Sequence, residues 1–233
     1  MSEIAVYVEG GGDTAGQKAE LRQGFDALFA REKSKAAEKS GSLRFICCGG
    51  RREAYEAFMY AVAVKPHLVN ALLVDSETSI APIPADHGQD AQVRLNHLSQ
   101  TRATDSRGQG DGWQFTGVPP ERIHLMVQCM EAWIVSDPDA LEGFYKQEFR
   151  RARLPARNNL EDEPKIDVYA KLGAATANTQ KGQYAKIRHA SKILLLIDPE
   201  KVGDRCPRFS IFRDWLNESI DLQPASWSGI GPR

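Results

Sequence analysis

The chain has 233 residues, 42% of them hydrophobic, and a formal net charge of −1. This length suffices for one large core, or for one domain with a helical appendage. The near-neutral balance neither favours nor excludes nucleic acid as a partner. The N-terminus enters an apolar segment without a basic leader, and no apolar run approaches the ~20 residues of a membrane span. We therefore expect a soluble cytoplasmic protein with no membrane partner.

The first 75 residues alternate apolar strands with amphipathic helices. Glu9 ends the first strand, and the three glycines that follow it free the backbone to turn. Thr14 and Gln17 fit a capping box, which predicts the start of a helix. The hydrophobic pattern predicts strands over residues 4–8, 43–47 and 70–75, and helices over about 14–40 and 51–64. This order favours parallel strands joined by right-handed crossovers.

The pattern fails between Ser76 and Phe115, where prolines and glycines predict a long loop over the acidic edge of the sheet. Trp113 and Phe115 are expected to anchor its far end in the core. The remaining elements are a helix near 90–98, a strand at 123–127, a helix after Cys129, and helices over about 139–151, 164–172, 184–198 and 207–220. The sequence predicts an α/β fold: a mainly parallel sheet flanked by helices in residues 1–142, with a helical C-terminal part, 143–233, packed on it.

Acidic residues follow three of the predicted strands, and they are Glu9 with Asp13, Asp75 with Glu77, and Glu131. The carboxyl ends of parallel strands meet at one edge of a sheet, so these side chains could converge there. Crowded carboxylates repel one another unless a cation holds them, and oxygen ligands alone favour Mg²⁺ or Mn²⁺. Such ions assist phosphoryl transfer and phosphodiester hydrolysis. The alternative is that each acid is a solvated turn residue, or a helix cap in the case of Asp13 and Glu77.

Basic residues offer candidate phosphate contacts. Arg51 and Arg52 follow two glycines at a predicted helix start, where a phosphate could bind. Lys181 and Lys186 lie in a basic segment, between residues 144 and 192, that holds 11 Lys or Arg against 5 Asp or Glu. A phosphate-tracking surface and an ordinary solvated helix face are both compatible with this pattern.

Several motifs together resemble a known fold family. The segment YVEGGGD (7–13) and the strand ending in Asp75-Ser-Glu77 resemble the Toprim fold, the acidic metal-binding core of topoisomerases, primases and overcoming-lysogenization-defect (OLD) nucleases. With HLMVQCMEAW (124–133) and CPRF (206–209), they resemble more closely an uncharacterised bacterial Toprim-like family. Its members are often encoded beside an ABC-type ATPase, and some act in anti-phage defence.

The resemblance implies a Mg²⁺- or Mn²⁺-dependent nuclease acting on DNA or RNA, with an ATPase or a second copy of the chain as further partners. Glu9 would bind metal and act as base, while Asp75 and Glu77 would hold the metal, with Asp13 and Glu131 in support. A downstream lysine, Lys181 or Lys186, would assist at the scissile phosphate. Independently of the resemblance, Arg51, Arg52 and Lys181 are the candidate phosphate contacts, and Arg51 and Arg52 could instead be solvated residues of a glycine turn. The chain departs from the family pattern at Asp75-Ser-Glu77, where Asp-x-Asp is usual. A non-catalytic subunit that docks on an ATPase is the alternative hypothesis, and a metal-dependent phosphotransferase is a third.

Overall fold

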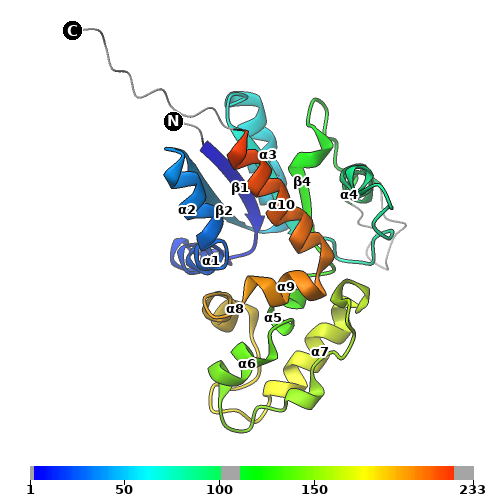
Figure 1. Cartoon of the computed structure of the whole chain (residues 1–233). Helices are drawn as coiled ribbons and strands as arrows, with labels where there is room; N and C mark the ends of the chain where they lie inside the picture. Colours follow the sequence, from blue (N-terminus) through cyan, green and yellow to red (C-terminus); the bar gives the residue numbers. More distant parts are fainter. Residues whose placement is uncertain (1–2, 101–110, 223–233) are drawn as a thin grey trace, which may run out of the picture.

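The computed structural model describes residues 3–100 and 111–222, and its centre is a four-stranded parallel sheet (Figure 1). The strand order is β2-β1-β3-β4, so the first and third strands are neighbours. The strands are β1 (Glu3–Glu9), β2 (Ser42–Gly49), β3 (Val69–Asp75) and β4 (Ile123–Met126). The predicted α/β fold, with its parallel sheet and helical C-terminal region, is confirmed.

Ten α-helices surround the sheet in the described residues. They are α1 (Ala15–Leu28), α2 (Ala30–Glu38), α3 (Arg51–Val64), α4 (Asp90–Ser99), α5 (Met130–Val135), α6 (Pro138–Tyr145), α7 (Lys165–Thr176), α8 (Lys186–Leu194), α9 (Pro199–Arg205) and α10 (Pro207–Asp221). Short 3-10 turns occupy His87–Gln89, Pro120–Arg122, Arg151–Arg153 and Leu160–Asp162.

Local sequence explains where several helices begin and end. Thr14 accepts the Gln17 N–H while the Gln17 side chain accepts the Thr14 N–H, which is the predicted capping box. The single helix expected over 14–40 is in fact two, because the chain leaves helical geometry at Phe29. The helix expected over 139–151 already ends at Tyr145, where Lys146 takes a φ of +60°. Helix α9 was not predicted.

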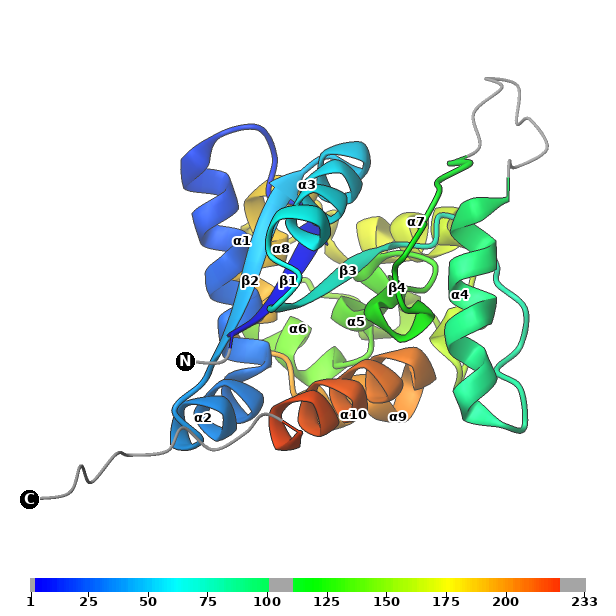
Figure 2. The ribbon, with the colours of Figure 1, turned by 90° about the horizontal axis from the view of Figure 1, so that it is seen from above.

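The two faces of the sheet are covered by different helices, and the alternation of β1 determines which side chain meets which helix. Ile4, Val6 and Val8 belong to a core cluster with residues of α1, α2, α5, α8 and α10. Ala5 and Tyr7 belong to a second cluster with residues of α3 and α4. Figure 2, from above, shows α1, α2 and α10 along one side of the sheet and α4 beyond β4.

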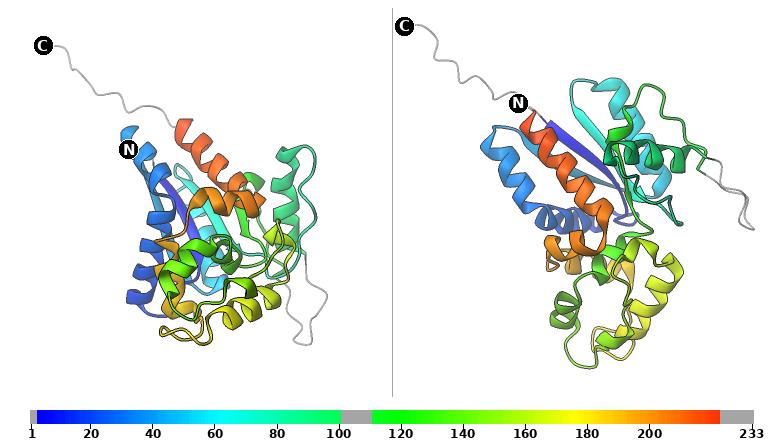
Figure 3. Two further views of the ribbon diagram at one scale, coloured as in Figure 1. Left: turned by 60° about the horizontal axis from the view of Figure 1, so that its bottom comes forward. Right: turned by 45° about the vertical axis from the view of Figure 1, so that its right-hand side comes forward.

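The helices α5 to α8 lie beyond the carboxyl ends of the strands (Figures 1 and 3). They therefore cover the edge of the sheet where the predicted acidic residues are found. The same core cluster includes Val6 of the sheet and Leu172 of α7, so packing is continuous between the two regions. The boundary after residue 142 stays a prediction. Within 3–100 and 111–222, no helix is long and apolar enough to cross a membrane.

The long loop between β3 and β4 is tied down at several described points. Helix α4 confirms the short helix expected near 90–98. Phe115 is buried, and Trp113 stacks on Tyr55 with ring centroids 4.5 Å apart. Residues 101–110 of the loop and the tail 223–233 lie outside the described residues, as do the predictions that concern them.

Candidate metal centre

Three carboxylates converge at the carboxyl edge of the sheet. Oxygen atoms of Glu9, Asp75 and Glu77 all lie within 4.8 Å of one another, and within the described ranges they form the one group suited to hold a metal ion. Glu9 comes from the end of β1, Asp75 from the end of the adjacent β3, and Glu77 from the residues that follow. The convergence expected from the strand ends is therefore present for these three side chains.

The Gly10–Gly12 turn gives Glu9 its place. All three glycines have positive φ, from +63° to +120°, and a Cβ added at Gly11 would come within 2.9 Å of the Lys18 backbone. Gly10 and Gly49 exchange backbone hydrogen bonds, which close the turn against β2. Residues other than glycine would strain this turn, so the glycines hold the chain close to α1 while β1 delivers Glu9 to the edge.

The Glu9 carboxylate is mostly buried, with 15% of its side chain exposed. Its Oε2 accepts the Asp75 N–H at 3.1 Å and faces the Arg51 guanidinium at 3.3 Å, whereas no described residue donates to Oε1. Burial and then the Asp75 charge raise the pKa of Glu9 to about 7, against the opposing effect of Arg51 and Lys186. Glu9 can therefore exchange a proton near neutral pH.

Asp75 is the fully buried member of the cluster. Its Oδ1 accepts the Met130 N–H at the start of α5, at 2.8 Å, and its backbone carbonyl accepts a bond from Arg51. Its Oδ2 faces two ammonium groups, at 3.3 Å for Lys165 and 3.5 Å for Lys186. Asp75 thus connects the sheet to the helices that cover this edge.

Glu77 leaves the strand direction and turns back toward Asp75. Its backbone has a φ of +67°, and its N–H donates to the Gln128 carbonyl at 3.0 Å. Strand β3 ends at Asp75, so the expectation that the strand ends between the two acids is confirmed. Glu77 Oε1 accepts a bond from the Lys165 ammonium at 2.6 Å.

Glu131 lies outside the three-carboxylate cluster and forms a separate contact set. It is fully buried, and its Oε1 accepts the Tyr184 hydroxyl at 2.9 Å. Its Oε2 accepts no hydrogen bond from a described residue and lies 3.8 Å from the Lys186 ammonium. Burial would lower the pKa of Lys186, but the charges of Asp75 and Glu131 outweigh burial and raise it. Lys186 is therefore held as a cation between two buried carboxylates.

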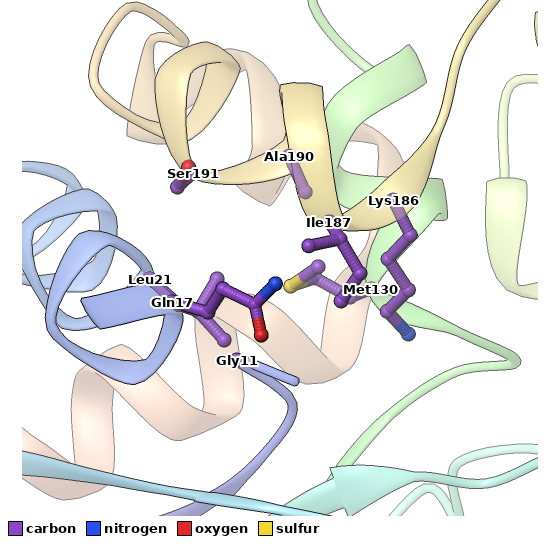
Figure 4. A pocket seen from close by; sticks show the side chains of 8 residues that line it. All are labelled: Gly11, Gln17, Leu21, Met130, Lys186, Ile187, Ala190 and Ser191. Atoms are coloured by element: carbon purple, nitrogen blue, oxygen red, sulfur yellow. The ribbon is translucent and has the colours of Figure 1, made fainter. Parts of the chain in front are cut away.

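The extended backbone before α8 explains why the side chains of Tyr184 and Lys186 both reach Glu131. Ala185 has extended φ and ψ, so the side chains on either side of it leave the chain in the same direction. Figure 4 shows Lys186 at one side of a small pocket between α1 and α8, its ammonium end directed away from Gln17. The enclosed space of about 20 Å³ is enough for roughly one water molecule.

The other predicted site residues lie in different surroundings. Asp13 is exposed and does not join the cluster. Arg52 is exposed and pairs with Glu56 one helical turn away, at 2.7 Å. Lys181 precedes α8, and its ammonium lies 4.8 Å from the ring centre of Phe144.

Arg51 does reach the site, but its guanidinium is already hydrogen-bonded to acidic side chains. It donates to both Asp111 carboxylate oxygens, at 2.9 and 2.7 Å, as well as to Glu9. Sequence reasoning missed both Asp111 and Lys165. Lys165 lies in the segment that was recognised as basic, yet nothing in its spacing distinguishes it from the neighbouring lysines.

The donor set fits a hard divalent cation. All candidate ligand atoms are carboxylate oxygens, the type that Mg²⁺ and Mn²⁺ prefer. Asp111 neutralises the charge of Arg51. Two lysine charges, on Lys165 and Lys186, then stand against four carboxylates, which are the three of the cluster and Glu131. When all four are ionised, two negative charges remain, which one divalent cation would neutralise.

This arrangement defines an α/β protein with an acidic centre at the carboxyl edge of a parallel sheet. The chain belongs to the family described as a domain of unknown function, DUF4276, whose model matches residues 8–217. The matched region contains all the site residues above. No curated protein and no solved structure matches the chain significantly.

Proposed function

We propose that this protein is a metal-dependent nuclease that hydrolyses phosphodiesters of DNA or RNA at the Glu9–Asp75–Glu77 centre. The observation that carries the proposal is the convergence of these three carboxylates within 4.8 Å, beside two lysines. The resemblance of the surrounding motifs to Toprim nucleases supports it.

In this proposal Glu9, Asp75 and Glu77 hold one Mg²⁺ or Mn²⁺ ion. Such an ion, when bound, stabilises negative charge that develops on phosphate oxygens. Glu9 would accept the proton of the attacking water through Oε1, because its Oε2 already accepts the Asp75 N–H. Lys186 offers its charge to the phosphate from its place between Asp75 and Glu131. Asp13 remains a candidate for outer support of the metal.

Nicking by the purified chain tests the proposal. Supercoiled plasmid and labelled single-stranded RNA would be incubated with Mg²⁺, Mn²⁺ or EDTA, using wild type and Asp75→Asn. The expected result is metal-dependent cleavage of one substrate by wild type and at least a hundredfold slower cleavage by the variant, consistent with loss of a group that holds the metal. Equal cleavage by both proteins would show that a contaminant or another site is responsible.

A non-catalytic subunit that docks on an ABC-type ATPase is the second candidate. The observation that favours it is the apolar surface formed by Leu195 and Leu196 directly after α8, where the two residues are 49% and 54% exposed. The same surface would suit assembly of two copies of the chain. Co-expression with an ABC-type ATPase from the same source distinguishes the candidates, since a Leu195→Asp and Leu196→Asp double variant should abolish a complex without affecting a nuclease that acts alone.

A further inference from the structure

Lys165 occupies a cation position within the acidic centre. Its ammonium donates to Glu77 Oε1 at 2.6 Å and lies 3.3 Å from Asp75 Oδ2, so it bridges two of the three clustered carboxylates. Its side chain is 25% exposed, whereas that of Asp75 is fully buried. An ammonium with two carboxylate partners is a monovalent substitute for an oxygen-bound metal ion.

Gln128 fixes the geometry of this bridge. Its side-chain Oε1 accepts the Lys165 N–H at 3.1 Å, and its backbone carbonyl accepts the Glu77 N–H at 3.0 Å. The same residue therefore aligns the backbones that carry the ammonium and the carboxylate. The position of the bridge is therefore fixed by backbone hydrogen bonds as well as by the two side chains.

Lys186 differs from Lys165 in this respect. Its ammonium is 3.5 Å from Asp75 and 3.8 Å from Glu131, and these contacts are ion pairs without a direct hydrogen bond to a carboxylate. Lys186 thus lies beside the cluster, and Lys165 lies in it. The two lysines have different positions with respect to any cation that binds Asp75 and Glu77.

We propose that Lys165 is a displaceable counter-ion. It neutralises Asp75 and Glu77 until a divalent cation binds them, and its ammonium then moves on its flexible stem to the phosphate of the substrate. This inference rests on the proposed function, because it requires the metal at the three carboxylates. The exchange is balanced in charge: the carboxylates trade a monovalent partner for a divalent one, and the released ammonium gains an anionic partner. A lysine that served structure alone would stay on its carboxylates in both states.

Metal affinity of variants distinguishes a displaceable lysine from a structural one. Mn²⁺ binding would be measured by electron paramagnetic resonance at about pH 8, on wild type, Lys165→Met and Lys171→Met. Removal of the competing ammonium should tighten Mn²⁺ binding about tenfold, the size expected of a partly exposed charge-assisted hydrogen bond. Lys171→Met is the matched control, because Lys171 lies on the same helix and pairs with Glu163, outside the cluster. It should leave Mn²⁺ affinity unchanged.

Two results would overturn the inference in different ways. If wild type binds Mn²⁺ and Lys165→Met binds it equally or more weakly, Lys165 is no competitor, and the proposed function survives. If wild type binds no Mn²⁺ at all, the metal centre and the displacement fail together. Lys165→Gln, which keeps hydrogen-bond donors and removes the charge, replaces the methionine variant if that variant does not fold.

A second measurement needs no variant. Amine acetylation of wild-type protein, followed by peptide mass spectrometry, reports whether the Lys165 ammonium is engaged. The acetylation rate of Lys165 should rise several-fold when Mn²⁺ is added, while the rate of Lys171 stays constant. An unchanged Lys165 rate at saturating Mn²⁺ would show that the ammonium keeps its carboxylates, which excludes the exchange.

Discussion

Replacement of Glu9 by Gln should stabilise the metal-free protein above neutral pH. The Glu9 carboxyl has an ordinary pKa of 4.5 when unfolded and a pKa of about 7 in the folded protein, raised by burial and by Asp75. The folded state therefore binds this proton more tightly than the unfolded state does. The stability that the protonated group contributes is fully present below about pH 4.5 and is lost as the pH rises through about 7.

The difference between the two pKa values sets the size of the effect. A shift of about 2.5 units corresponds to about 3 kcal/mol at 1.36 kcal/mol per unit. Gln keeps the shape of the protonated acid but adds a donor near Arg51, so a gain of about 2 kcal/mol is expected for Glu9→Gln at about pH 8. In a chain of this length such a gain raises Tm by roughly 5 °C. At about pH 4.5, where the protonated Glu9 contributes its full stability, the added donor should leave the variant about 1 kcal/mol less stable than wild type.

Urea unfolding followed by circular dichroism in EDTA, across this pH range, measures the effect. Glu3→Gln is the control, because Glu3 lies on the same strand and pairs with the exposed Arg44 at 3.0 Å. Its change should stay within about 0.5 kcal/mol at each pH. A Glu9→Gln protein less stable than wild type at about pH 8 would mean that the attraction between Glu9 and Arg51 outweighs burial. The hypothesis that burial and repulsion from Asp75 destabilise the ionised form of Glu9 would then be wrong.

Three further outcomes are expected. Mn²⁺ should raise the Tm of wild type in a concentration-dependent way by mass action, and Asp75→Asn should abolish the rise in differential scanning fluorimetry; a rise that persists places the ion elsewhere. Arg208→Met should cost about 3–5 kcal/mol in urea unfolding, because Asp90 and Glu161 lose a buried partner, and a cost below about 1 kcal/mol would contradict this. Thr14→Ala should cost about 1 kcal/mol through loss of the capping box, whereas Thr78→Ala, outside any helix, should cost less.

The parts of the fold that follow local rules were predictable from the sequence. The capping box at Thr14 and the helix over 51–64 depend on neighbouring residues, and the structure contains both. The end of β3 between Asp75 and Glu77 was predictable for the same reason. The convergence of Glu9 with Asp75 follows from parallel strands, a property of the topology that the alternation of strands and helices already indicated.

The break at Phe29 illustrates what local rules miss. The residues on either side of it continue a helical pattern, yet the chain turns there and Phe29 enters an aromatic cluster. Its ring lies 5.1 Å from Phe45 and 5.4 Å from Phe209 and Phe212, measured between ring centres. These partners are distant in sequence, so the packing that stabilises the turn produces no pattern in the residues next to Phe29.

The conspicuous motif CPRF (206–209) has a structural explanation that the sequence did not supply. Arg208 is buried and donates to Asp90 of α4, to Glu161 and to the Ala81 carbonyl. It thereby ties α10 both to the loop that follows Glu77 and to the turn that precedes Lys165. A residue far from the carboxylates in sequence thus holds together the segments that flank them.

The charges of the centre come from two separate stretches of the chain. Glu9, Asp75 and Glu77 lie in the first, at strand ends where a parallel sheet collects side chains. Lys165 and Lys186 lie in the second, on helices whose placement depends on the apolar core that they share with the sheet. The carboxylates could be predicted because topology alone brings them together. Lys186 was a candidate only through the resemblance, beside Lys181, and Lys165 was missed, because the positions of these lysines depend on how α7 and α8 dock on the sheet. The charge balance that a metal ion would meet therefore arises only when the two stretches pack together.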